Sequence, residues 1–162
     1  MKKTWQEKLK DRASLPKVLR LQKGFPCYNA VHKMGAEVGD DVVLVNPSEV
    51  IEIMRQGPKG KLITLTGICK RIARQHNVQA CCTLTAGIFT MTAANAVEEA
   101  SRKGKKLDIP YWRTLKVDGF LNPKYPGGQD VHKRLLEQEG FRVIARRRKY
   151  QVFDYDKYLV KV

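Results

Sequence analysis

The segment from residue 83 to residue 102 constrains the fold more than any other part of this sequence. Ala, Met, Ile and Val recur along it at helical spacing, Glu98 and Glu99 lie late in it, and Gly104 follows its end. The pattern predicts one long helix, although the threonines in it are mediocre helix formers. A face of small side chains, which would allow close approach to another protein backbone or to DNA, is formed by Ala86, Gly87, Ala93 and Ala94.

Two shorter helices are predicted before this segment. "NPSEVIEIMRQGPKGK" has Ser48 as a candidate N-cap and stops at Gly57-Pro58. "GICKRIARQH" places Ile68 and Ile72 on one face, with Thr66 as a candidate cap. Because only the short polar turn "NVQ" separates this helix from the next segment, the order is that of a helix-turn-helix motif.

The regions on either side complete the predicted architecture. Residues 1–45 combine a short helix with strands at 17–22 and 42–45, and form an N-terminal arm or small subdomain. After residue 108, "YWRTLK" is strand-like, and an Asp-Gly turn and a loop follow, which together resemble a wing. A helix in "QDVHKRLLEQEG" and one or two basic strands end the chain. We therefore expect an α+β, mainly helical protein with a winged helix-turn-helix domain at 46–162 and a short N-terminal extension.

Charge narrows the choice of partner. The chain has 31 Lys and Arg against 16 Asp and Glu, a net charge of +15, and such an excess attracts polyanions. Nucleic acid is the first candidate, an anionic membrane surface the second, and an effect on solubility alone the third. With no long apolar run and no apolar segment after the charged N-terminus, we expect no membrane partner and a cytoplasmic, nucleoid-associated location.

No cofactor or metal site is expected. The chain has four cysteines, and the sequence contains no C-x-x-C pair. Its histidines are isolated from one another, so neither residue type shows the spacing of a zinc site. In a cytoplasmic protein, disulfides are not expected either.

The segment after the predicted helix-turn-helix carries a family resemblance. "PYWRTLKVDGF", the Gly-Gly loop and "LLEQEG" resemble the DNA-binding domain of the O6-alkylguanine-DNA alkyltransferases, whose acceptor motif reads Pro-Cys-His-Arg. The resemblance covers about residues 58–141. The positions that match the family pattern are Pro110, Arg113, Asp118, Gly119, Tyr125, Gly127, Gly128, Leu135, Leu136, Glu139 and Gly140.

Two departures from that pattern bear on the chemistry. Tyr111 stands at the acceptor-cysteine position and Trp112 at the histidine position, and Glu139 matches the glutamate that orients the histidine. Alkyl transfer needs a thiolate and a neighbouring base, and a tyrosine hydroxyl without such a base is a poor substitute. The chain therefore resembles the alkyltransferase-like proteins, which lack the acceptor cysteine. The resemblance implies a non-enzymatic protein that flips alkylated guanine and flags it for nucleotide excision repair.

Two further departures concern DNA contact. The family has a tyrosine where Leu65 stands here, and it inserts an arginine where this sequence has none. Leu84 or Ile88 is a candidate apolar wedge in place of that arginine.

The resemblance and the charge pattern together predict the site residues. The predicted lesion pocket consists of Tyr111, Trp112, Arg113, Tyr125, Gly127, Gly128 and Glu139. The predicted DNA-binding residues are Thr64, Leu65, Thr66, Thr83, Leu84, Thr85, Ile88, Arg146, Arg147 and Arg148. We expect a monomer on double-stranded, alkylated DNA, with nucleotide-excision-repair proteins as further partners and no catalytic residue.

Each assignment has a structural alternative. Tyr111 and Trp112 are equally compatible with a place in the core, and Arg113 with an ion pair to Glu139. The threonines at 83 and 85 can serve as helix caps, and the basic run at 146–149 as a solvated face.

Two other functions stay open from the sequence. Cys82, at a helix start, is the candidate acceptor of an active alkyltransferase, against its place as a small buried residue. A general winged-helix DNA-binding protein without lesion recognition is the other possibility.

Overall fold

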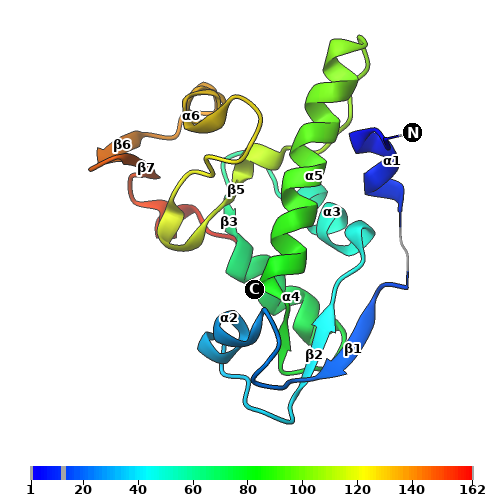
Figure 1. Ribbon diagram of the computed structural model, residues 1–162. Helices are drawn as coiled ribbons and strands as arrows, with labels where there is room; N and C mark the ends of the chain where they lie inside the picture. The colour runs from blue at the N-terminus through cyan, green and yellow to red at the C-terminus, as the bar shows by residue number, and fades with distance from the viewer. Residues whose placement is uncertain (1, 12–13, 162) are drawn as a thin grey trace.

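The computed structural model describes residues 2–11 and 14–161 and confirms an α+β, mainly helical protein (Figure 1). The α-helices are α1 (Trp5–Lys10), α2 (Tyr28–Lys33), α3 (Pro47–Gln56), α4 (Leu65–Gln75), α5 (Thr83–Arg102) and α6 (Gly128–Gln138). The strands are β1 (Lys17–Arg20), β2 (Asp41–Leu44), β3 (Ile63–Thr64), β4 (Ala80–Cys81), β5 (Thr114–Leu115), β6 (Val143–Arg146) and β7 (Lys149–Val152). None of these helices combines the length and apolar character needed to cross a membrane.

Helix α5 is the centre of the fold, with the bounds predicted for it. It contacts α1, α3 and α4, and its buried face consists mainly of alanines and threonines. Ala86, Ala93 and Ala94 have no exposed surface, so the small-residue face approaches protein. Small side chains let α3 and α4 pack close to the axis of α5, and this leaves its other face free near the N-terminus.

The N-caps of α3 and α4 differ from the predicted ones by two residues. Asn46, rather than Ser48, caps α3: its side chain accepts the Ser48 N–H, and Glu49 completes a capping box. Thr64, rather than Thr66, caps α4 by accepting the Gly67 N–H at 3.1 Å. Ile68 and Ile72 are fully buried, as predicted.

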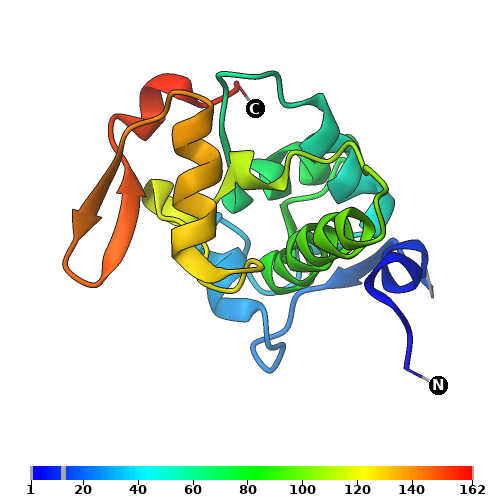
Figure 2. The same ribbon diagram turned by 90° about the horizontal axis from the view of Figure 1, so that it is seen from above.

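The N-terminal residues join the rest of the chain through a three-stranded sheet in the order β1-β2-β4. β1 and β2 are antiparallel, with Val18 opposite Val43, and β2 pairs in parallel with β4, with Val43 opposite Cys81. The sheet and the contact between α1 and α5 pack residues of the first 45 positions against the rest of the chain (Figure 2). The division into domains at 1–45 and 46–162 stays a prediction.

Two predictions for the part after residue 108 were wrong in detail. Residues 111–113 form a 3-10 turn rather than a strand, and the strand β5 that follows pairs in parallel with β3. The Asp118-Gly119 turn does not join two strands of a wing. The antiparallel hairpin lies nearer the C-terminus, where β6 pairs with β7 and packs against α6.

Candidate nucleic-acid interface

The three residues after Pro110 pack with His132 and Glu139 in one cluster, which we call the motif cluster: Tyr111, Trp112, Arg113, His132 and Glu139. Glu139, at the C-terminal cap of α6, accepts the Arg113 Nε–H at 2.9 Å and the Trp112 Nε1–H at 2.5 Å. Arg113 also donates from Nη1 to the Gly57 carbonyl at 2.6 Å. Since both members of the ion pair are largely buried, the alternative interpretation of Arg113 as a structural partner of Glu139 is confirmed.

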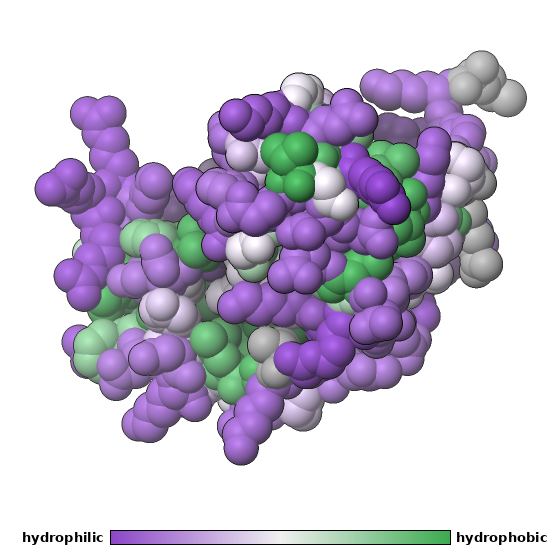
Figure 3. Space-filling model, turned by 90° about the horizontal axis from the view of Figure 1, so that it is seen from below, coloured by the Kyte–Doolittle hydropathy of each residue, from purple (hydrophilic) through white to green (hydrophobic). Residues whose placement is uncertain are grey.

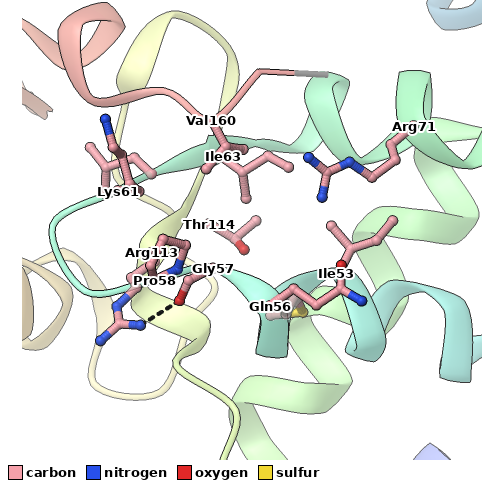
Figure 4. Close-up of a pocket in the computed structure, with 12 residues that line it drawn as sticks. Ile53, Gln56, Gly57, Pro58, Lys61, Ile63, Arg71, Arg113, Thr114 and Val160 are labelled. Atoms are coloured by element: carbon pink, nitrogen blue, oxygen red, sulfur yellow. Dashed lines mark hydrogen bonds between the residues drawn. The ribbon is translucent and has the colours of Figure 1, made fainter.

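Figure 4 shows the side of Arg113 that faces Gly57. A cavity of about 240 Å³ lies there, with Arg71, Ile63 and Val160 among the residues in its wall. Arg71 donates to the Lys161 carbonyl at 2.9 Å. The guanidinium of Arg113 therefore links Glu139, at the end of α6, to Gly57, at the end of α3.

Tyr111 is a core residue in this structure. Its side chain has no exposed surface, its hydroxyl donates to Glu98 of α5 at 2.9 Å, and its ring packs edge-on against Trp112 and Tyr125. Burial, reinforced by the Glu98 carboxylate, raises the pKa of the Tyr111 hydroxyl far above its usual range. A hydroxyl held in this way cannot easily become a phenolate nucleophile.

His132 is buried at the base of the cluster, between two backbone groups. The Asn122 N–H donates to Nδ1 at 3.1 Å, and Nε2 lies 2.7 Å from the Trp112 carbonyl. Since Nδ1 accepts, the proton is on Nε2 and the ring is neutral. Burial lowers the pKa of His132 to about 4.

Gly127 and Gly128 start α6 rather than contact a groove. Gly127 has a φ of 80°, and a Cβ added to it would lie 2.2 Å from Val131 Cγ2. A side chain at this position would disturb the first turn of α6. The match of this position to the family pattern therefore has a local steric reason.

A groove with a volume of about 440 Å³ lies beside the motif cluster, between the N-terminal half of α5, the start of α4 and residues 114–125. Its lining residues are Leu65, Thr83, Leu84, Gly87, Ile88, Thr90, Met91, Thr114, Leu115, Lys116, Asn122, Lys124 and Tyr125. Leu84 and Ile88, one helical turn apart, are 48% and 55% exposed. Together they form an exposed apolar edge of the groove on the N-terminal half of α5.

The groove brings together five of the predicted site residues. Four come from the predicted DNA-binding set and one, Tyr125, from the predicted lesion pocket: Leu65, Thr83, Leu84, Ile88 and Tyr125. Tyr125 donates from its hydroxyl to the Thr114 carbonyl at 3.1 Å, and burial raises the pKa of that hydroxyl well above its usual range. The assignment of a lesion pocket to the predicted residues stays a prediction.

Other predicted contact residues lie elsewhere. Thr64 and Thr66 stand at the start of α4, where Thr64 acts as its cap. Thr85 donates to the Cys82 sulfur at 3.3 Å.

Sequence reasoning missed the polar groove residues outside the predicted sets, three of which come from one loop. Lys116, Asn122 and Lys124 lie on the loop after the acceptor-like motif, and the two lysines are exposed. The two lysines could have been predicted as DNA contacts, because they flank a predicted turn in a protein with a net charge of +15. Their position opposite α5 depends on the tertiary fold and could not be derived from spacing.

The C-terminal hairpin supplies a basic edge. Arg146, Arg147, Arg148 and Lys149 are all exposed, and Arg147 sits in the turn with a φ of 60°. Figure 3 shows hydrophilic side chains projecting from this edge of the molecule, at the left of the view. The predicted DNA-contact arginines are therefore accessible.

The cysteines are separate from the groove. All four are free and buried, and Cys82, the alternative acceptor, is 4% exposed. A hydrogen bond with the neighbouring thiol of Cys69, reinforced by burial, raises the pKa of Cys81 far above its usual range. Among the described residues that line the groove there is no cysteine.

Comparison with known proteins yields similarity of structure alone. No family model matches the sequence, and no curated protein matches it. The chain is similar to the crystal structure of ATL from S. pombe in complex with DNA, at a TM-score of 0.52 and 18% identity, over 72% of this chain and 94% of the other. It is similar, at a TM-score of 0.51 with the same identity and coverage, to S. pombe Atl1 in complex with damaged DNA containing O6-carboxymethylguanine. The chain thus has the fold of an alkyltransferase-like protein over most of its length.

Proposed function

We propose that this protein binds double-stranded DNA carrying O6-alkylguanine and holds the lesion without transferring the alkyl group. The observation that carries the proposal is the groove beside the exposed Leu84 and Ile88, at the end of α5 next to the acceptor-like motif. Two crystal structures of the S. pombe protein with this fold contain DNA, and in one of them the DNA carries O6-carboxymethylguanine. The net charge of +15 and the basic hairpin favour a polyanionic partner.

In this proposal the lesion base is flipped into the groove. A volume of about 440 Å³ lies within the range of small-molecule sites and is sufficient for a purine with a substituent. Flipping costs a few kcal/mol. Leu84 and Ile88 would fill the space that the base leaves in the stack, in the manner of apolar wedges. Lys116 and Lys124 at the rim, together with the hairpin arginines, would neutralise backbone phosphates.

The positions of the possible nucleophiles support a role without alkyl transfer. Tyr111 is buried and bonded to Glu98, and its hydroxyl pKa is raised. Cys82 is buried at the start of α5, and it is not one of the described residues that line the groove. A held but unreacted lesion would serve as a flag, and nucleotide-excision-repair proteins are the proposed recipients.

A general DNA-binding role is the second candidate, and one observation favours it. The described N-terminal half of α5 presents Leu84 and Ile88 but no arginine, so the side chain that the resemblance places in the base stack is absent. A protein of this kind would bind through charge alone, with an affinity set by salt and duplex length.

A paired titration separates the candidates. The affinity for a duplex with one O6-methylguanine is compared with that for the same duplex with guanine, across a salt series, and intact protein mass is read on the same samples. We expect tighter binding to the lesion duplex at every salt concentration and an unchanged protein mass. Equal affinities would leave the general DNA-binding role, and a methyl adduct would establish an alkyltransferase that uses a cysteine.

A further inference from the structure

Four cations gather at the C-terminal end of α5, and we call them the end patch: Arg102, Lys103, Lys105 and Lys106. All four are exposed. Gly104, between them, has a φ of 72°, and the N–H groups of Lys103 and Lys105 both donate to the Ala100 carbonyl, at 3.0 and 2.9 Å. This closed turn folds the chain back over the end of the helix, so the four side chains emerge from one small area.

The end patch is only partly neutralised by the described acids. None of its four residues takes part in an ion pair with a described acid, whereas Arg113 is paired with Glu139. Glu98 accepts from Tyr111. Glu99 attracts Lys103 electrostatically, but its carboxylate oxygens accept the backbone N–H groups of Trp5 and Gln6 at 3.0 and 3.3 Å.

The end patch concentrates four like charges in a small area. These charges repel one another, and the dipole of α5 favours cations only within its last turn. An anionic partner would relieve the repulsion, which is the physical reason to look for one.

The end patch lies far from the groove. α5 runs from Thr83 to Arg102, and a rise of about 1.5 Å per residue separates its two ends by roughly 30 Å. Figures 1 and 2 both place the C-terminal end of α5 well away from the hairpin β6–β7, which lies at the left edge of each view. A straight duplex that lies over the groove and the hairpin would therefore leave the end patch free.

We propose that the end patch is a second DNA-binding surface, which holds a duplex segment other than the one in the groove by contacts to its phosphates. The choice of DNA as the partner rests on the proposed function of the groove. Contacts from four flexible cations recognise the spacing of backbone charge and carry no base specificity. One molecule would then bridge two segments, so that it could pass from one to the next without release.

The test is a bridging assay with the full chain. A duplex with one O6-methylguanine is immobilised and saturated with protein, free protein is washed away, and a fluorescent unmodified duplex is added. We expect capture of the second duplex in a complex of one protein with two duplexes, measured by native mass spectrometry. Four phosphate contacts predict a loss of roughly a hundredfold in second-duplex affinity between 50 and 200 mM salt.

Two variants with equal charge loss make the assay specific. The end-patch variant carries Arg102→Gln, Lys103→Gln, Lys105→Gln and Lys106→Gln. The control variant carries Lys17→Gln, Lys23→Gln, Lys33→Gln and Lys59→Gln, four exposed lysines outside the groove and the end patch. We expect the first variant to lose capture at least tenfold while it keeps its affinity for the immobilised duplex, and the control to keep both. Circular dichroism checks that both variants fold.

Several results would overturn the proposal: no capture by the unaltered protein, equal losses in the two variants, or a complex of two proteins with two duplexes. Preference for a single-stranded RNA over the second duplex would also overturn it. The assay is repeated with an unmodified immobilised duplex, which separates the two proposals. Equal binding of both immobilised duplexes with intact bridging contradicts the lesion-binding function alone, and lesion preference without bridging contradicts the end patch alone.

Discussion

The motif cluster and the groove meet at Tyr125 but differ in how their side chains are used. In the motif cluster, the polar atoms of Trp112, Arg113 and Glu139 bond to one another or to backbone groups. In the groove, Leu84 and Ile88 are about half exposed and the cations of Lys116 and Lys124 face solvent. Tyr125 packs its ring against Tyr111 on one side and lines the groove on the other.

This difference separates family resemblance from surface chemistry. The residues that match the acceptor motif set the position of α6 and of the 3-10 turn relative to α3 and α5. The side chains that could contact a ligand come mainly from α5, which lacks the arginine that the family inserts, and from the loop after β5. A motif without its nucleophile can retain residues such as Arg113 and Glu139, because their contacts fix the position of α6 relative to α3.

The largest expected effect tests the structural role of the motif cluster. Glu139→Ala removes the partner of the buried Arg113 and of the Trp112 N–H. An unpaired buried charge costs about 3–5 kcal/mol, so the free energy of unfolding should fall by that amount in a urea titration. Glu137→Ala is the matched control on the same helix. Glu137 has only a 3.5 Å pair with Lys133 at the surface, and its loss should cost less than about 0.5 kcal/mol.

The distinction between a structural motif cluster and a ligand-binding groove would fail if Glu139→Ala left stability unchanged and weakened binding to O6-methylguanine DNA. Glu139 would then contact the ligand directly, as the predicted lesion pocket requires. A fall in stability together with a proportionate loss of folded protein would place Glu139 in the scaffold.

The second effect is the pH dependence of stability that His132 confers. Burial lowers its pKa from near 6.5 to about 4, so between these values the unfolded chain binds a proton that the folded protein does not. The contribution is present above pH 6.5 and is lost as the pH falls toward 4, by about 2 kcal/mol between pH 7 and pH 5. Urea titrations at pH 7 and pH 5 measure the free energy of unfolding of the unaltered protein and of His132→Gln. Since the carboxylates titrate in both proteins, the fall in this free energy between the two pH values should be smaller in the variant by about 2 kcal/mol. Identical losses in the two proteins would mean that His132 is charged in the fold.

The sequence was sufficient for the elements in which local and tertiary preferences agree. The bounds of α5 were predicted to the residue, because the small buried face and the Gly104 stop point to the same ends. The caps of α3 and α4 were misplaced, since each start offers more than one polar side chain within three positions. Only the backbone path selects Asn46 and Thr64.

Elements that depend on distant partners could not be predicted. Residues 111–113 are rich in aromatic side chains, which favour strands, but they form a 3-10 turn. In this turn Tyr111 reaches Glu98 of α5 and Arg113 reaches Glu139, two contacts that depend on the tertiary fold. The two-residue strand β4 exists only because β2 lies beside it. Five groove residues were predicted from the sequence. Lys116 and Lys124 were missed, because their position opposite α5 also depends on the tertiary fold.

A third effect tests the groove. A Leu84→Ala, Ile88→Ala double variant removes two half-exposed side chains, so its stability should change by less than about 1 kcal/mol. If they act as wedges, affinity for the O6-methylguanine duplex should fall about tenfold, or about 1.4 kcal/mol. Fluorescence anisotropy measures the affinity, and Val38→Ala, 53% exposed and not among the groove residues, is the control. A large loss of stability with unchanged affinity would make these side chains part of the core.

The smallest effect separates stability from binding at a single residue of the hairpin. Arg147 has a φ of 60°, a left-handed conformation that costs a non-glycine residue about 1 kcal/mol. Arg147→Gly relieves that cost but adds freedom to the unfolded chain, so stability should change by less than about 0.5 kcal/mol. If Arg147 neutralises a phosphate, DNA affinity should still fall a few-fold, and the slope of log affinity against log salt should decrease by about one. Arg148→Gly removes the same charge where φ is not left-handed, so it should cost about 0.5–1 kcal/mol of stability. Equal stability changes in the two variants would show that the turn does not strain Arg147, and unchanged salt slopes would remove the hairpin from the DNA interface.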